Sequence, residues 1–184
     1  MKKFTKYILF ISLGLLCSCS DYLDIVPDNV TTLDIVFNNK NTAQRYLANC
    51  YHFVPDHGSV KRIPGMGAGH ECWFYTDKDS YFDNEVSFYI ARGLQNTNAP
   101  YANYWDGEGG SKLPMFRAIR ECNIFLSYVR DQHKVNDLTD SERKRWIAEV
   151  NVLKAYYHFF LFEHYGPIPI VDEALPVSTS SEGV

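Results

Sequence analysis

Three segments of the chain carry apolar residues at the spacing of an amphipathic helix. In the first, residues 41–54, these residues recur at i, i+3, i+4, i+7, i+8 and i+11, which places them on one helical face: Ala43, Tyr46, Leu47, Cys50, Tyr51 and Val54. Asn41 and Gln44 resemble a capping pair. Pro55 predicts the end of this helix, because the residue before a proline avoids the helical conformation.

The second helix is predicted to start at Pro114, because proline is favoured at the first helical position. Its apolar residues step by 4, 3, 4 and 3 and form one stripe: Met115, Ile119, Cys122, Leu126 and Val129. Asn123 lies at the edge of this stripe. We expect its amide to bond to a backbone group rather than to a ligand.

The third helix is predicted to open at the capping box Thr139-Asp140-Ser141-Glu142 and to stop at Gly166-Pro167. One stripe holds Trp146, Val150, Leu153, Tyr157, Phe160, Leu161 and His164, and a second holds Val152, Tyr156 and Phe159. A helix that is apolar almost all round is expected to be buried on several sides. Residues 168–171 then favour a short extended segment.

The rest of the chain shows no sustained helical period. Residues 20–40 are polar and predict an extended tether with a short turn near 33–37. Residues 55–113 combine Gly, Pro, Asn and Asp with many aromatic residues. A stretch this long without regular structure is uncommon in a compact domain, so we expect it to be functional and to contain short helices or strands. The predicted fold class is all-α: stacked antiparallel helix pairs of tetratricopeptide type with a long irregular aromatic-rich insertion.

The N-terminus has the features of an export signal. Lys2, Lys3 and Lys6 precede the apolar run 7–16, which is too short to span a bilayer. The run ends in Leu16-Cys17-Ser18-Cys19, which resembles the lipobox of bacterial lipoproteins. We expect cleavage before Cys19 and lipid on its thiol. An ordinary signal peptide with two incidental cysteines is the alternative.

Charge and cysteine content narrow the function classes. Removing residues 1–18 would take away three lysines and no acid, so the charge of −4 becomes 15 − 22 = −7. An acidic chain is a poor candidate for binding nucleic acid or anionic lipid. Cys50, Cys72 and Cys122 remain, and an odd count argues against a disulfide framework. Buried free thiols are therefore expected at Cys50 and Cys122, and a bridge between them is the alternative.

The aromatic-rich stretch 70–105 contains the residue types that bind sugars. Flat rings stack on the C–H faces of pyranoses, and amides, carboxylates and guanidinium groups bond to the hydroxyls. The candidate ligand-binding residues are Trp73, Tyr75, Asp77, Tyr81, Arg92, Tyr101 and Asn103. Trp73 is the preferred one, although for any single aromatic residue core packing is the competing interpretation. Trp105 is assigned to the structural framework.

The sequence argues against metal chemistry and catalysis. Asp77-x-Asp79 begins like a calcium loop, but Phe82 stands where such a loop requires glycine, so structural calcium is only an alternative. The adjacent trio His70-Glu71-Cys72 lacks a second cluster at zinc-ligand spacing. Motifs for a serine elbow, a zinc protease or a phosphate loop are missing. We expect no enzymatic activity and no cofactor besides the lipid on Cys19.

Several motifs, in order, are similar to a known family. They are CSDYLD at 19–24, the helix with Tyr46, Leu47 and Cys50-Tyr51, FRAIRECNIFL at 116–126 after Trp105, KAYYHF at 154–159 and YGPIPIV at 165–171. Together they resemble the N-terminal part of the SusD/RagB family. Two departures are Lys154, where that family usually has arginine, and the Gly-rich stretch between Trp105 and Phe116, which is longer than usual.

The resemblance implies an outer-membrane lipoprotein that captures glycans or peptides at the cell surface. It also implies a partner, a TonB-dependent transporter of the SusC/RagA type, and an all-α fold with tetratricopeptide-like units. The expected organisation is a signal peptide at 1–18, a lipid-anchored tether at 19–40 and a helical domain at 41–184 that corresponds to part of a longer protein. A helical interaction scaffold without a small ligand, or a surface glycoside hydrolase, is the alternative function.

Overall fold

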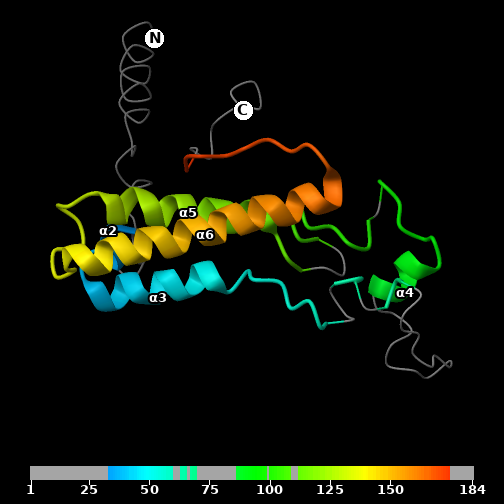
Figure 1. Cartoon of the computed structure of the whole chain (residues 1–184), viewed down its shortest axis with the longest axis horizontal. Coiled ribbons are helices and arrows are strands. Elements are labelled where there is room, and N and C mark those ends of the chain that lie inside the picture. Colours follow the sequence, from blue (N-terminus) through cyan, green and yellow to red (C-terminus); the bar gives the residue numbers. More distant parts are fainter. Residues whose placement is uncertain are drawn as a thin grey trace, which may run out of the picture. The chain divides into compact units, whose positions relative to one another are not determined.

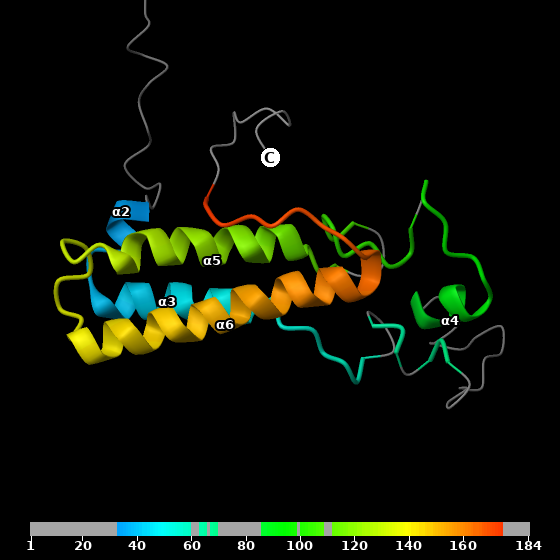
Figure 2. The same cartoon turned by 45° about the horizontal axis from the view of Figure 1, so that its top comes forward.

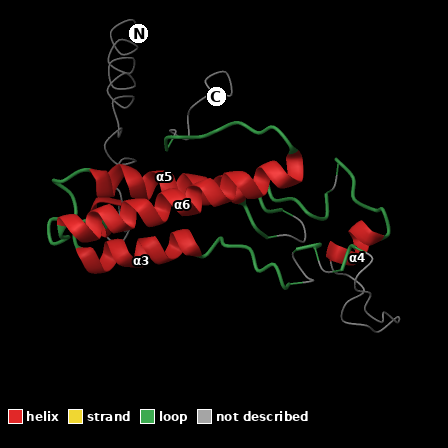
Figure 3. Ribbon diagram, in the orientation of Figure 1, coloured by secondary structure: helices red, strands yellow, loops and turns green. Residues whose placement is uncertain are grey.

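The computed structural model describes residues 33–59, 63–65, 67–69, 86–98, 100–108 and 112–174. Within these residues the helices are α2 (Leu33–Val36), α3 (Lys40–Tyr51), α4 (Val86–Ala91), α5 (Met115–Arg130) and α6 (Asp140–Tyr165). The described part of the chain contains no strand (Figure 3). The predicted all-helical character is confirmed.

The body of the protein is an antiparallel hairpin of α5 and α6, with α3 alongside both helices. Figures 1 and 2 show the three helices side by side from two directions. Their inward residues form one hydrophobic core, in which Ile119, Phe125, Val150 and Leu161 are completely buried. Burial of such side chains stabilises a fold by roughly 1.5–3 kcal/mol each, so this core dominates the stability of the described part.

The predicted apolar stripe of α5 is confirmed, since Met115, Ile119, Cys122, Leu126 and Val129 are all buried. Pro114 is the N-cap residue of α5, so the helix begins at Met115, one position after the predicted start. The predicted amide partner of Asn123 is also confirmed. Its Nδ2 donates to the carbonyls of Val171, at 3.0 Å, and Glu173, at 3.1 Å.

The ends of the first predicted helix were wrong. The N-cap of α3 is Asn39 rather than Asn41, and the Asn39 side chain accepts a hydrogen bond of 3.1 Å from the backbone N–H of Thr42. The helix ends at Tyr51, before the predicted stop at Pro55. Ala43, Leu47 and Cys50 are buried as predicted, but Tyr51, the last residue of α3, and Val54, which follows the helix, are exposed.

The predicted ends of α6 are confirmed. The capping box forms through the N–H of Glu142, which donates to Oγ1 of Thr139, and the N–H of Thr139, which donates to Oε2 of Glu142. Gly166 follows the last turn with a φ of 76°, a conformation that favours glycine. The first stripe is buried except for His164, which is exposed.

The second stripe of α6 does not have the surroundings that its sequence predicts. Val152 is 69% exposed and Phe159 is 54% exposed, while Tyr156 is half-buried. The helix has one covered side, which faces α3 and α5, and an outer side on which Phe159 and Phe162 share an apolar groove with Ile168 and Ile170. The prediction of burial on several sides is therefore wrong for the described part of the chain.

Cys50 on α3 and Cys122 on α5 are buried free thiols, as expected. A hydrogen bond with Cys122, together with burial, raises the pKa of the Cys50 thiol above its ordinary value. Both thiols lie in the core beside Tyr157, whose hydroxyl donates to the carbonyl of Cys50 at 2.5 Å. The protonated form of Cys50 is therefore strongly favoured, and the thiolate is the reactive form of cysteine.

One buried arginine closes the connection between α5 and α6. Arg143 is only 7% exposed, and its guanidinium donates to four backbone carbonyls. These belong to Val129, Asp131, Lys134 and Val135, at 2.6, 3.1, 3.0 and 3.1 Å. The five N–H donors of a guanidinium suit such a set of acceptors, which a lysine could not satisfy together.

After α6 the chain turns back along the hairpin as residues 167–174, here called the return segment (Figure 1). His158 helps to hold it, because its Nε2 accepts from the N–H of Val171 at 3.3 Å while its Nδ1 bonds to the carbonyl of Lys154 at 2.8 Å. Lys154 donates to the carbonyl and carboxylate of Asp172 at 3.1 and 3.0 Å. The segment is extended, as predicted, but forms no strand.

Two short helices lie in stretches that were predicted to be irregular. The first, α2, falls at the expected turn near 33–37, and Phe37 behind it is fully buried against Tyr46 and Tyr128. The second, α4, was not predicted. Its six residues span fewer than two turns, so they show no sustained helical period.

We predict that Arg143→Lys lowers the free energy of unfolding by about 2 kcal/mol, because a single ammonium group leaves buried carbonyls without donors. Urea unfolding followed by circular dichroism measures this change. Arg145→Lys is the matched control, since Arg145 is 67% exposed on the same helix and its replacement should change stability by less than about 0.5 kcal/mol. Equal stability of Arg143→Lys and wild type would contradict the role given to the guanidinium.

We also predict that acid weakens the contact between Lys40 on α3 and Glu142 on α6. The hydrogen bond from Lys40, then those from Thr139, lower the pKa of Glu142 from 4.5 to about 2. Stability from this carboxylate is fully present above pH 4.5 and is lost as the pH falls toward 2.

Glu142→Gln should therefore be less stable than wild type at pH 7, and its stability should fall less between pH 5 and pH 2. Urea unfolding across that pH range tests this. Glu149→Gln serves as the control, because the ion-pair partner of Glu149 is the exposed Arg145 on the same helix, at 3.6 Å. Parallel pH profiles of Glu142→Gln and wild type would overturn the prediction.

Candidate ligand-binding site

A polar groove of about 680 Å³ lies in the loop between α4 and α5. Its lining consists of amide, hydroxyl, carboxylate and ring groups from one stretch of chain: Asn96, Thr97, Asn98, Pro100, Tyr101, Asn103, Asp106 and Glu108. We call this the loop groove. Its composition suits a ligand that offers many hydrogen-bonding groups and an apolar face.

Side chains of the loop hold the first half of the groove in shape. The Gln95 side-chain oxygen accepts from the backbone N–H groups of Tyr101 and Ala102, at 2.8 and 3.2 Å. Asn96 accepts from the N–H of Asn98 at 3.1 Å, a contact typical of a tight turn. The backbone of this half is therefore ordered by bonds within the loop.

The second half is held by Asn103 and Asp106. The Asn103 amide donates to the Asp106 carboxylate at 2.6 Å, while its oxygen accepts from the N–H of Trp105 at 3.1 Å. The same Asp106 oxygen accepts from the N–H of Glu108 at 2.9 Å. These bonds fix the positions of the Asp106 carboxylate and the Asn103 amide before any ligand arrives, which reduces the entropy lost on binding.

The aromatic ring in the groove is Tyr101, and Tyr89 of α4 supports it. Their rings are stacked in parallel, with centroids 4.0 Å apart and an interplanar angle of 6°. Tyr101 is half-buried. One face of its ring is thus occupied by Tyr89, part of the side chain packs against the hydrophobic core, and the remaining part lines the groove.

Tyr165 at the end of α6 fixes the loop to the helical hairpin. The backbone N–H of Tyr104 donates to the Tyr165 hydroxyl at 2.8 Å, and the N–H of Met115 donates to the carbonyl of Tyr104 at 2.9 Å. The buried Tyr104 ring packs edge-on against Phe160, at 5.0 Å between centroids. Burial raises the pKa of Tyr165, so its hydroxyl stays protonated.

Trp105 packs beside this connection, as its assignment to the framework predicts. Its ring lies 4.5 Å from Phe116 of α5 and 5.7 Å from Tyr165, centroid to centroid. The indole is 43% exposed, so it covers the junction of the loop with α5 and α6 rather than filling the core. The longer stretch between Trp105 and Phe116 does not prevent this contact.

The electrostatics of the loop groove disfavour an anionic ligand. Among the described residues, its lining contains two acidic side chains, Asp106 and Glu108, and no lysine, arginine or histidine. A phosphate or carboxylate would meet like charge there, without a cation to compensate its loss of water. Hydroxyl and amide N–H groups, in contrast, can donate to the carboxylates in charge-assisted hydrogen bonds.

A second groove, of about 640 Å³, runs beside the return segment and includes Arg130, Lys154, His158, Asp172 and Glu173. Here Lys154, His158 and Asp172 form hydrogen bonds within the protein. The hydrogen bond from Lys154 lowers the pKa of the Asp172 carboxyl. Lys154, the departure from the family pattern, therefore holds the return segment against α6, and this groove is a structural junction.

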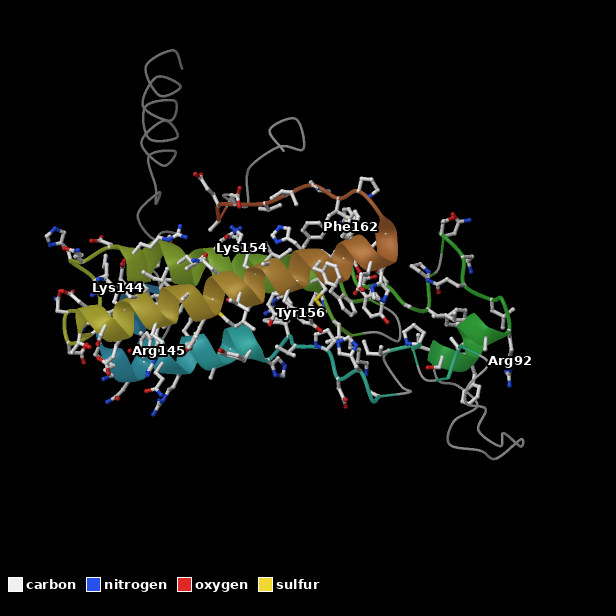
Figure 4. The ribbon with its side chains drawn as sticks, in the orientation of Figure 1. Arg92, Lys144, Arg145, Lys154, Tyr156 and Phe162 are labelled. Atoms are coloured by element: carbon white, nitrogen blue, oxygen red, sulfur yellow. The ribbon has the colours of Figure 1, made fainter. Side chains whose placement is uncertain are left out.

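The structure brings together two of the predicted site residues. Tyr101 and Asn103 both line the loop groove. Arg92 is exposed just after α4 and is not among the groove-lining residues (Figure 4). Trp73, Tyr75, Asp77 and Tyr81 lie outside the described residues, as do Cys19 and Cys72.

The sequence interpretation missed the acidic side of the groove. Asp106 and Glu108 lie just beyond the aromatic-rich stretch 70–105, which supplied the predicted site residues. A usable signal was present, since Asn103 and Asp106 are three positions apart and side chains of this kind often close turns. Within the described ranges, no group of three or more His, Cys, Asp or Glu residues could hold a metal ion.

None of the helices in the described ranges is long and apolar enough to cross a membrane. Searches among curated proteins and among solved structures gave no match. One family model, described as SusD-like, starch-binding and associating with the outer membrane, matches residues 21–182, most of the chain. The resemblance seen in the sequence motifs is thereby confirmed, and the chain belongs to the SusD-like family.

Proposed function

We propose that this protein is a cell-surface lipoprotein that binds a neutral glycan in the loop groove for uptake through a partner TonB-dependent transporter. Membership of a family described as starch-binding and associated with the outer membrane supports the class of function. The observation that carries the choice of site is the groove itself, which combines a supported ring with amides and carboxylates and, in the described part of the chain, is lined by no cationic residue.

The expected mode of binding follows from the chemistry of a sugar. The C–H face of a pyranose would lie on the part of Tyr101 that lines the groove, because apolar contact of two flat surfaces is favourable. Ring hydroxyls would donate to Asp106 and Glu108 and exchange hydrogen bonds with Asn98 or Asn96. Trp73, Tyr75, Asp77, Tyr81 and Arg92 remain candidates for further contacts.

A peptide is the alternative ligand, since backbone N–H groups and an amino terminus could also donate to the two carboxylates. A peptide backbone, however, lacks the combination of a flat C–H face and surrounding hydroxyls that a ring and closely spaced amides would bind. The function is binding rather than catalysis. The helical hairpin of α5 and α6, with α3 beside it, would be part of a tetratricopeptide-type stack that presents the loop groove and contacts the transporter.

We predict that Tyr101→Ala lowers the affinity for a maltooligosaccharide about tenfold, because the stacking surface is lost. Tyr101→Phe should keep most of the affinity, since it retains the ring. Isothermal titration calorimetry with maltoheptaose measures both. Asn151→Ala, in the groove beside the return segment, is the matched control and should bind as wild type. Equal affinities of wild type and Tyr101→Ala would remove the loop groove from the proposal.

The proposed anchor is tested separately. Cys19→Ala should abolish metabolic labelling with palmitate and move the protein out of the membrane fraction, because three acyl chains hold a protein stably where one binds only marginally. Cys17→Ala is the control, since the lipobox pattern assigns the lipid to Cys19. Undiminished labelling of Cys19→Ala would show that the anchor was assigned to the wrong residue.

A further inference from the structure

The return segment is held mainly through its backbone. The Asn123 amide of α5 donates to two of its carbonyls, and Lys154 of α6 donates to a third. His158, also on α6, accepts from the backbone N–H of Val171. Figure 2 shows the segment running back along these two helices. Among the three residue types, only histidine ordinarily changes its charge between pH 5 and pH 8, so the contact of His158 is the one that mild acid can remove.

The partners of His158 determine which form of its ring the segment can bind. Nδ1 lies 2.8 Å from the carbonyl of Lys154, which can only accept, so Nδ1 carries a hydrogen. Nε2 lies 3.3 Å from the backbone N–H of Val171, which can only donate, so Nε2 carries none. The closed segment therefore requires the neutral imidazole with its hydrogen on Nδ1. A second proton on Nε2 would place two donors opposite each other.

We propose that the return segment is a strap that opens in mild acid, and that the neutral imidazole of His158 is the latch that keeps it closed. Protonation of Nε2 removes the acceptor of the Val171 N–H, so the open state becomes more populated. Ile168 and Val171 pack against the hydrophobic core in the closed state. Opening therefore exposes apolar surface of α5 and α6 that the strap covers at neutral pH.

The charged groups around His158 are two of each sign. Arg130 of α5 and Lys154 of α6 line the same groove as His158, together with Asp172 and Glu173 of the return segment. The carboxylate of Asp172 would attract an imidazolium, but it is already paired with Lys154 at 3.0 Å and its side chain is 79% exposed, so water screens it. The hydrogen bond to the Val171 N–H is therefore the contact that decides between the two forms of the ring.

The size of the effect follows from the titration of histidine in water. At pH 7.5 most free imidazoles are neutral, whereas at pH 5.5 the protonated form outnumbers the neutral form by about ten to one. Because only the neutral form closes the latch, the ratio of closed to open strap should fall by up to about tenfold between these two pH values. The stabilisation is present above neutral pH and is lost as the pH falls.

Hydrogen exchange of the full chain, followed by mass spectrometry at pH 7.5 and pH 5.5, tests the proposal. Rates are divided by those of an unstructured peptide at the same pH. In wild type, the protection of residues 168–173 should fall by up to about tenfold in acid. His158→Gln should keep its protection at both pH values, because the glutamine oxygen can accept from the Val171 N–H and does not titrate. Equal protection of wild type at both pH values overturns the proposal.

His164→Gln is the matched control. His164 lies on the same helix and its Nδ1 bonds to the carbonyl four residues earlier, at 2.7 Å, as in His158, but its ring packs against Tyr104. This variant should keep the acid response of wild type, and loss of the response in it would refute His158 as the latch.

Nitrogen NMR of wild type gives a second measurement that needs no variant. At pH 7.5 the imidazole of His158 should carry its hydrogen on Nδ1 and none on Nε2. A hydrogen on Nε2 at this pH would also overturn the proposal, whether or not His158→Gln folds.

Discussion

The rest of the structure depends on the burial of the facing apolar stripes of α5 and α6. Neither helix could bury its apolar stripe away from water alone. In the antiparallel arrangement, each helix covers the stripe of the other. Phe125 of α5 packs against Trp146 of α6 within this core. The guanidinium of Arg143 donates to backbone carbonyls at the end of α5 and in the connection between the helices. α3 then attaches through the hydroxyl of Tyr157 and the carbonyl of Cys50.

The candidate site is attached to one end of this hairpin. Tyr165 is the last residue of α6, and its hydroxyl accepts a bond from the backbone of Tyr104 in the loop. Met115, the first residue of α5, bonds to the same Tyr104. The loop groove thus takes its position from the two helix ends where α5 begins and α6 stops, while its internal shape comes from its own side chains.

The parts that follow from local spacing could be predicted from the sequence. The α5 stripe, the capping box at Thr139 and the stop at Gly166 each depend on residues within a few positions, and all three are observed. The end of α3 could not be placed in this way, because an apolar period can continue past the last helical residue, as it does at Val54. The second apolar stripe of α6, which includes Val152 and Phe159, shows the same limit, since a pattern reveals that a face is apolar but not what covers it.

The site was predictable only in part for a related reason. Composition pointed to Tyr101 and Asn103, but the roles of Asp106 and Glu108 depend on turns that bring them to the same side of the loop. The support of Tyr101 by Tyr89 depends on α4, whose six residues leave too short a pattern to recognise.

The hydrogen bonds that order the loop groove have a consequence for how its specificity can evolve. Each joins residues no more than seven positions apart, from Gln95 with Ala102 to Asn103 with Trp105. Substitutions of the lining residues can therefore reshape the groove, as long as Tyr104 and Trp105 keep the loop on α5 and α6. Relatives with the same helices could acquire different nutrient preferences through changes in this short loop between α4 and α5.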